Sequence, residues 1–114
     1  MHSPIPAQIA DKLRGREFKN WDDFRKSFWK EVAKDDILKG RFDVDNINDM
    51  KRGLAPRVSE HQWYGGCTSY VLHHDNPVHR SGEVYDLTNI HIVTPKYHSQ
   101  VLPKEIHYGI KKKK

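Results

Sequence analysis

Four residues in the C-terminal third of the sequence have the types and the spacing needed for chemistry on a phosphodiester bond. A histidine pair, His73 and His74, is followed after fourteen residues by Asn89 and after eight more by His98. Neutral imidazole can hold a transition-metal ion, and its ordinary pKa of about 6.5 suits a general base. Phosphodiester hydrolysis needs a nucleophile, a base to deprotonate it and positive charge on the phosphoryl oxygens. The pattern therefore predicts a hydrolytic site.

The residues around these four positions predict a strand, a loop, a second strand and a helix. Residues 70–72 form an apolar run that leads into the histidine pair. Residues 76–77 and 80–82 have turn-forming compositions. Ile90 to Val93 is typical of the returning strand. Thr94-Pro95 then predicts a helix start, with threonine as the N-cap and proline at the first helical position.

This arrangement gives each polar residue an expected orientation. His73 and His74 are neighbours at a strand end, so one can face a metal ion while the other faces substrate. Asn89 can hydrogen-bond backbone across the loop and hold His74 in place. We expect His98, one turn into the helix, to face the strand pair. His91 alternates with apolar residues and is expected on the opposite strand face, at the surface or near the phosphate.

The remaining histidines and the single cysteine carry no such pattern. We expect His2, His61 and His79 to be solvated or satisfied by structural contacts. Cys67 is the only cysteine, which excludes an internal disulfide and a cysteine-rich zinc site. Its sequence neighbours include nothing that would activate the thiol as a nucleophile.

Composition and charge are those of a water-soluble domain. The 114 residues suffice for one domain, and no apolar run approaches the roughly 20 residues needed to span a bilayer. The N-terminal residues Ser3-Pro4-Ile5-Pro6 predict no signal peptide. Of the net charge of +5, Lys111 to Lys114 contribute +4. This tail either attracts polyanions or is a solvated, disordered end.

The N-terminal half predicts several helices. The first runs from about Pro6 to Leu13 and ends at Gly15. Asn20 caps a stronger helix whose apolar residues recur at helical spacing and should form core. These residues are Trp21, Phe24, Phe28, Trp29 and Val32. Ile37 and Leu38 indicate a short helical turn before Gly40.

The middle of the chain is less regular. Asp45 or Asn46 is expected to cap one more helix that ends near Gly53. Residues 54–66 predict an irregular segment that contains Trp63 and Tyr64. These two aromatic residues either form a partner surface or fold under the core.

Together these features predict an α+β fold in which a helical N-terminal half packs on a C-terminal ββα-metal, or HNH, motif. We expect one domain over residues 1–114. Its helical part is expected over 1–66, the ββα motif over about 67–102 and a basic tail over 103–114. The motif favours an endonuclease.

The chain resembles the C-terminal nuclease domains of DNase colicins and S-type pyocins, bacterial toxins neutralised by small acidic immunity proteins. The resemblance extends over most of the chain. It rests on short segments at residues 3–6, 9–14, 22–26, 29–32, 65–66, 72–75, 82–86, 89–90 and 94–96. It implies a cytotoxic domain of a larger toxin, secreted by the producing bacterium, that cleaves DNA in the cytoplasm of the target bacterium.

The resemblance also implies roles for individual residues. His73 and His98 become ligands of one divalent metal ion (Zn, Ni or Mg), His74 becomes the general base, and Asn89 becomes the brace of His74. Residues 42–67 correspond to the segment that binds the immunity protein in the family. Three candidate contacts there are Arg52, Arg57 and Trp63.

The chain departs from the family pattern at its metal site. The position of a third metal-binding histidine is Leu102, so the site is expected to be weak or empty. An arginine and a glutamate that precede the histidine pair in the family correspond to Cys67 and Val71. His107 is a candidate substitute ligand, because five extended residues span at most about 17 Å.

Three functions therefore remain open. The leading interpretation is a metal-dependent HNH endonuclease that hydrolyses DNA. The second is a metal-independent ribonuclease on the same fold, because RNA supplies its own 2′-hydroxyl nucleophile and paired histidines can act as base and acid. The third is a catalytically dead module that binds only an immunity protein or nucleic acid.

Overall fold

The computed structural model describes residues 2–74 and 87–100. The predicted turns at 76–77 and 80–82, Leu102, His107 and the lysine tail lie outside these residues. The chain groups into two compact units, which divide at a different place from the predicted helical part and ββα motif. The helical unit is Pro6–Arg57, and the sheet unit joins the first five residues to the chain from Val58 onward.

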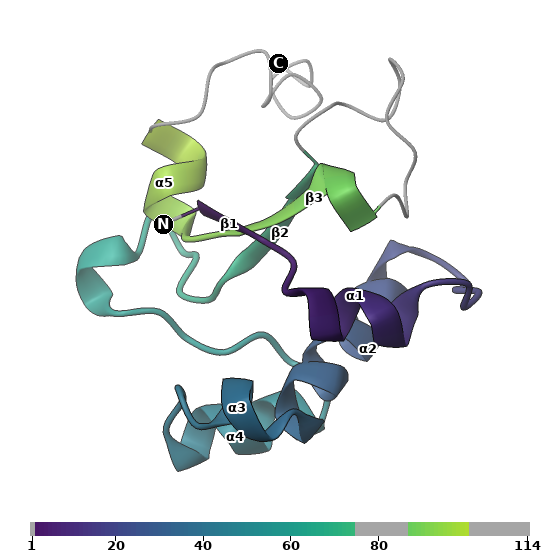
Figure 1. The fold of residues 1–114 in the computed structure, drawn as a ribbon. Coiled ribbons are helices and arrows are strands. Elements are labelled where there is room, and N and C mark those ends of the chain that lie inside the picture. Colours follow the sequence, from purple (N-terminus) through teal and green to yellow (C-terminus); the bar gives the residue numbers. More distant parts are fainter. Residues whose placement is uncertain (1, 75–86, 101–114) are drawn as a thin grey trace. The chain divides into compact units, whose positions relative to one another are not determined.

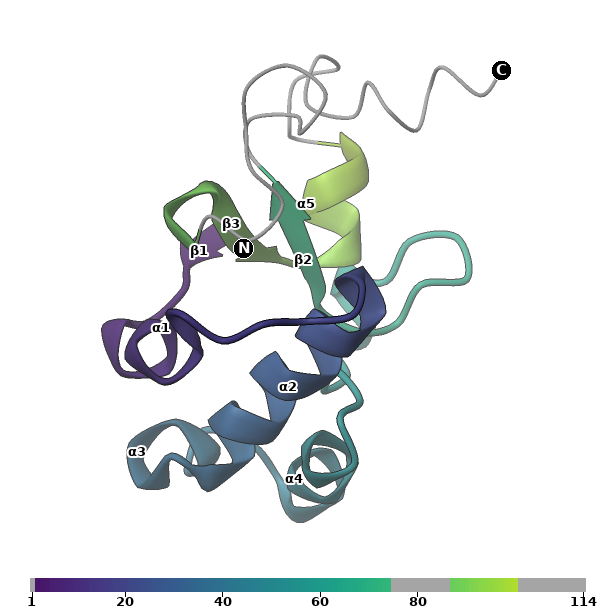
Figure 2. The same ribbon diagram turned by 90° about the vertical axis from the view of Figure 1, so that its right-hand side faces the viewer.

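The helical unit is built around one long helix. Helix α2 (Trp21–Lys34) contacts each of the other three, α1 (Ala7–Leu13), α3 (Asp36–Lys39) and α4 (Val44–Lys51), as Figure 2 shows. Helix α1 ends where predicted, with Gly15 adopting a φ of 83° that L-residues rarely take. The four predicted helices are therefore confirmed.

Helix α2 has the cap and the core face expected from its sequence. The Asn20 side chain accepts a hydrogen bond from the backbone N–H of Asp23 at 2.8 Å. Four of the five predicted core residues are buried, namely Phe24, Phe28, Trp29 and Val32. Trp21 is the exception: it is half-buried at the helix start and stacks on Phe24, with ring centroids 5.0 Å apart.

The predicted cap of α4 was wrong. Asp43, and not Asp45 or Asn46, is the N-cap, since its carboxylate accepts from the backbone N–H of Asn46 at 2.9 Å. A cap must precede the first helical residue so that its side chain can reach the N–H groups of the first turn. Asp45 lies inside that turn, where its negative charge interacts favourably with the helix dipole.

The sheet unit contains three antiparallel strands in the order β1-β3-β2, visible in Figure 1. Strand β2 (Val71–His74), strand β3 (Ile90–Val93) and helix α5 (Pro95–Gln100) form the predicted ββα arrangement. Two short 3-10 helices accompany them, η1 (Glu60–Gln62) and η2 (Leu87–Asn89). The α+β fold class is thus confirmed.

Strand β1 (His2–Pro4) was not predicted. It pairs with β3 along its whole length, so that Ser3 lies opposite Ile92. Three residues that include a proline show no alternating pattern, and their strand conformation depends on pairing with a distant edge. The residues expected to begin the helical half therefore contribute a strand to the sheet of the ββα motif.

The segment between α4 and β2 is mostly irregular, as predicted. It contains η1 and an isolated bridge between Tyr64 and Cys67, with Gly65 at a φ of 60° between them. Trp63 and Tyr64 keep 38% and 48% of their surface exposed, so neither residue is buried under the core, and their role in a partner surface stays a prediction. Among the described residues, no helix is long and apolar enough to cross a membrane.

Candidate active site

The structure brings two of the four predicted site residues, both of them histidines, into direct contact. The Nδ1 atom of His73 and the Nε2 atom of His98 are 3.0 Å apart, and the two rings meet edge to face with centroids 4.6 Å apart. His73 comes from β2 and is 7% exposed, while His98 comes from α5 and is half-buried. Two imidazole nitrogens therefore converge at one partly sheltered point.

Helix α5 presents His98 because its first turn is capped by Thr94. The Thr94 carbonyl accepts the backbone N–H of His98 at 2.9 Å, and the Thr94 hydroxyl accepts the N–H of Tyr97 at 3.3 Å. Pro95 occupies the first helical position, where its missing N–H costs no hydrogen bond. The predicted N-cap is confirmed.

The strand register decides which histidines share a face of the sheet. His73 is directly opposite His91, so these two side chains lie on one face. His74 is opposite Ile90 and belongs to the other face. His91 therefore lies on a different face from its strand neighbours Ile90 and Ile92, as expected, but it is half-buried beside His73.

The remaining two site candidates lie at the same end of the strand pair. His74 is the last residue of β2 and is half-buried. Asn89 immediately precedes Ile90, the strand partner of His74, and is only 9% exposed. Asn89 thus lies next to Ile90, the strand partner of His74. His73, which meets His98, belongs to the opposite face of the sheet.

The converging nitrogens fit part of a metal site. Two nitrogen ligands at about 2.0–2.1 Å from one tetrahedral zinc ion lie about 3.3 Å apart, close to the spacing found between His73 and His98. Within residues 2–74 and 87–100, however, no three His, Cys, Asp or Glu side chains are grouped to hold a metal. Among the described residues, therefore, His73 and His98 are two candidate ligands without a third beside them.

The three candidate partner contacts are distributed over both units. In the helical unit, Arg52 is the C-cap of α4 and forms an ion pair with Asp49 at 2.6 Å, and Arg57 is exposed. Asn46 accepts the backbone N–H of Arg57 at 2.9 Å, which fixes the chain there. In the sheet unit, the Trp63 indole donates to the Val58 carbonyl at 3.0 Å, so its ring is anchored although exposed.

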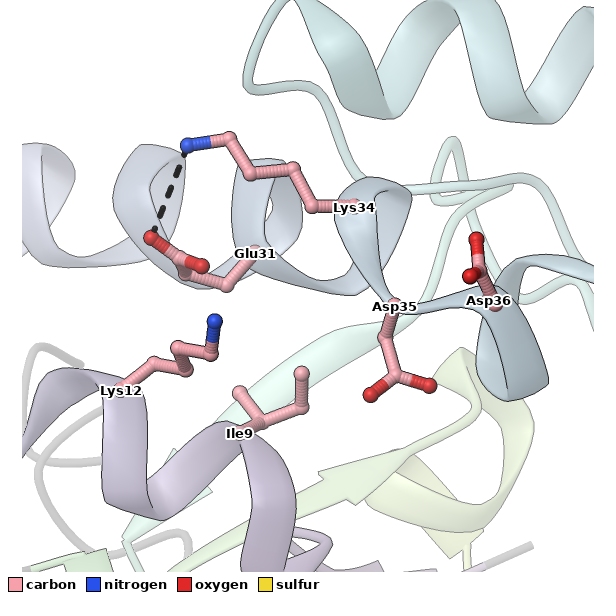
Figure 3. Close-up of a pocket in the computed structure, with 6 residues that line it drawn as sticks. All are labelled: Ile9, Lys12, Glu31, Lys34, Asp35 and Asp36. Atoms are coloured by element: carbon pink, nitrogen blue, oxygen red, sulfur yellow. Dashed lines mark ion pairs between the residues drawn. The ribbon is translucent and has the colours of Figure 1, made fainter.

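A separate pocket of about 160 Å³ lies in the helical unit, between α1, the end of α2 and α3 (Figure 3). Its charged residues largely satisfy one another. Glu31 pairs with Lys34 at 3.8 Å and with Arg16 at 3.1 Å, and Asp35 caps α3 through the N–H groups of Ile37 and Leu38. The pocket is lined by no histidine and by none of the four predicted site residues, so it is not a candidate for the chemistry predicted from the sequence.

One contact of the site was not anticipated from the sequence. The Thr94 hydroxyl donates a hydrogen bond to Oε1 of Gln62 in η1, at 2.7 Å. The cap itself was predictable, but its partner lies 32 positions earlier in an irregular segment. No local pattern marks such a residue, because its role depends on a contact that only the folded chain creates.

Comparison with known proteins places these features in one family. A sequence model described as "Colicin/Pyocin-S2, DNase domain" matches residues 1–108. Colicin-E8 of Escherichia coli is 50% identical over 99 residues, which cover 87% of this chain and 48% of that protein. Pyocin-S1 of Pseudomonas aeruginosa is 46% identical over 99 residues, covering 87% and 16%. The chain thus spans about half, or less, of these relatives.

Two solved structures share the fold. In the crystal structure of the pyocin AP41 DNase–immunity complex, one chain matches with a TM-score of 0.83 and 42% identity, over 93% of this chain and 79% of that one. The mutant nuclease domain of pyocin S8, solved with its cognate immunity protein, has a TM-score of 0.83 and 46% identity. That match covers 86% of this chain and 78% of the other.

Proposed function

The chain belongs to the family of colicin and pyocin-S2 DNase domains, and from this membership we propose that it is the DNA-cleaving domain of a bacteriocin. The observation that carries the proposal to individual residues is the convergence of His73 and His98 at 3.0 Å, beside the strand end that bears His74. The whole toxin is secreted by its producer, and this domain acts in the cytoplasm of the target bacterium.

In this proposal each site residue has a separate role in hydrolysis. HNH nucleases generally use a divalent metal ion, and His73 and His98, whose Nδ1 and Nε2 atoms converge, would hold it here. When bound, the ion supplies positive charge for the phosphoryl oxygens and the leaving oxygen. His74 accepts the proton of the attacking water, and Asn89, buried next to the strand partner of His74, keeps that imidazole in place.

One observation favours a second function. Leu102 occupies the family position of a third metal-binding histidine, and the described part of the chain contains no group of three candidate ligands. Paired histidines without a metal can act as base and acid on RNA, whose 2′-hydroxyl is the nucleophile. A metal-independent ribonuclease is therefore the alternative.

Incubation of the domain with plasmid DNA and with total RNA separates these functions. Each substrate is tested with EDTA and with added Mg²⁺, Ni²⁺ or Zn²⁺. We expect metal-dependent nicking of the plasmid, no nicking in EDTA, and loss of nicking in His73→Ala and His98→Ala. RNA cleavage that persists in EDTA would establish the ribonuclease, and no cleavage of either substrate would indicate a binding module.

We further propose that a small acidic immunity protein inhibits this domain by binding residues 42–67. Arg57 and Trp63 offer the residue types that dominate interface energies, and both are exposed. The Arg57 backbone is held by Asn46, and the Trp63 indole is held by the Val58 carbonyl. Arg52 is a weaker contact, because its guanidinium is already paired with Asp49. The candidate site histidines His73, His74 and His98 lie outside this segment, so inhibition does not require contact with them.

Substitutions at exposed residues of segment 42–67 should weaken inhibition. Arg57→Glu and Trp63→Ala should each lower the affinity for the cognate immunity protein by roughly 30-fold or more, which corresponds to about 2 kcal/mol at an interface hot spot. His98→Ala should leave the affinity unchanged. Calorimetric titration of the immunity protein into each variant measures the effect. The reverse result, with loss only in His98→Ala, would mean that inhibition occurs by plugging the active site.

A further inference from the structure

A continuous series of hydrogen bonds connects η1 to the candidate metal ligands within the sheet unit. Gln62 in η1 accepts from the Thr94 hydroxyl at 2.7 Å. Thr94 in turn accepts the N–H groups of Tyr97 and His98, at 3.3 and 2.9 Å. His98 then meets His73 at 3.0 Å. A path from the 3-10 turn η1 therefore runs through Gln62, Thr94 and His98 to His73, and the bond to Tyr97 is a side branch of it.

The bond between Thr94 and Gln62 fixes the orientation of the Thr94 hydroxyl, which caps α5. A threonine hydroxyl has one proton and two lone pairs. Because its proton is directed to Gln62, a lone pair remains for the Tyr97 N–H. Thr94 is 2% exposed, so water is a poor substitute for the glutamine oxygen. Without that acceptor, the Thr94 hydroxyl could rotate away from the orientation in which it accepts the Tyr97 N–H.

Helix α5 depends on such an external contact more than a longer helix would. It has six residues, Pro95–Gln100, and helices of that length are marginal on their own. Its position must therefore come from its neighbours, and η1 is one element that packs against it. A small rotation of so short a helix moves His98 relative to His73.

The 3-10 turn that bears Gln62 is itself fixed on both sides. The Gln62 N–H donates to the Ser59 carbonyl at 2.8 Å, and the Trp63 N–H donates to the Glu60 carbonyl at 3.0 Å. The Trp63 indole donates to the Val58 carbonyl at 3.0 Å. Val58 also donates its own N–H to the Thr68 carbonyl at 3.0 Å, close to the start of β2. Gln62 is thus held by a segment tied to the strand that bears His73.

We propose that Gln62 is a positioning residue of the nuclease site: through Thr94 it sets the position of α5 and thereby holds Nε2 of His98 against Nδ1 of His73. The proposal rests on the proposed function for the metal role of the two histidines. The geometric part does not, because it concerns only the contact between the two rings and the bonds that lead to it.

The test compares three replacements of Gln62 with wild type. Gln62→Ala removes the acceptor, Gln62→Met removes it while keeping the side-chain length, and Gln62→Glu keeps an oxygen at nearly the same place. Glu60→Ala, an exposed position in the same turn, is the matched control. Two quantities are measured: the NMR contact between the His73 and His98 rings in metal-free protein, and Co²⁺ affinity by calorimetry.

We expect Gln62→Ala and Gln62→Met to weaken the ring-to-ring contact and to lower Co²⁺ affinity by about tenfold, the lower end of the effect of outer-shell partners. Gln62→Glu should restore both quantities, and Glu60→Ala should change neither. If the alanine variant does not fold, the methionine variant decides. A lower melting temperature with an unchanged ring contact would reduce Gln62 to a structural role and overturn the proposal.

The two proposals fail in different ways. If wild-type protein bound no Co²⁺ while Gln62→Met still separated the two rings, the positioning role would stand and the metal-binding role of the histidines would be wrong. If wild type bound Co²⁺ and the Gln62 variants kept both the affinity and the ring contact, the metal site would stand and Gln62 would not position it.

Discussion

Replacement of His74 by alanine is expected to lower phosphodiester cleavage by about 10²- to 10⁴-fold, the usual effect of losing a general base, while leaving the fold intact. His74 is half-buried at the end of β2, on the face of the sheet opposite to His73. In the proposed mechanism it therefore acts on substrate without holding the metal. Initial rates of plasmid nicking at saturating Mg²⁺ or Ni²⁺ measure the effect.

The His74 experiment needs a control for a general loss of histidine or of structure. His61→Ala removes an exposed imidazole in η1 and should nick plasmid at the wild-type rate. Far-UV circular dichroism should be the same for both variants. His74→Ala should also keep the wild-type affinity for the immunity protein, since residues 42–67, and not His74, bind the partner in our proposal. Wild-type rates in a folded His74→Ala protein would remove His74 from the mechanism.

Much of this fold could be predicted because its signals are local. The Asn20 cap, the aromatic stripe of α2 and the Thr94-Pro95 helix start each depend on residues within one or two turns. The cap of α4 was misplaced by two or three residues, since several acidic and amide side chains occur together at 43–49 and each is a competent cap. Local chemistry indicated the helix but not its first residue.

What could not be predicted depends on pairing across long stretches of chain. Strand β1 exists because His2–Pro4 finds an edge of β3, about 90 residues away by its register with residues 91–93. The bond between Gln62 and Thr94 likewise joins residues that are far apart in the sequence. His91 was assigned to the correct face, but only the register with β2 reveals that it lies directly opposite His73.

The candidate site was predictable to a similar degree. Adjacent histidines, an asparagine and a helix-borne histidine at this spacing predicted a convergence that the structure contains for His73 and His98. The reason is that two short strands and one capped helix leave little freedom for the positions they carry. The roles of His74 and Asn89 stay predictions, as do the three partner contacts, because they concern molecules that must be added to test them.

Replacement of Leu102 by histidine is expected to tighten metal binding and to raise metal-dependent DNA cleavage. A catalytic zinc site usually has three protein ligands and one open position. The described residues bring no three candidate ligands together, and His73 and His98 are the two that we propose. Outer-shell changes alone alter metal affinity by about 10- to 100-fold, so a restored ligand should give at least about a tenfold increase. Titration of Zn²⁺ into wild type and Leu102→His, followed by calorimetry, measures it.

Leu102→Asn is the matched control, because it introduces a polar side chain without an imidazole and should leave Zn²⁺ affinity near that of wild type. Tight binding by wild type would contradict the argument from the missing ligand. In that case His107 becomes the first candidate for completing the site, and His107→Ala should then release the metal. For a metal-independent ribonuclease, Leu102→His would change RNA cleavage little and EDTA would not inhibit it. The Zn²⁺ affinity of Leu102→His and the EDTA sensitivity of wild type thus distinguish a weakened metal nuclease from an enzyme that has dispensed with metal.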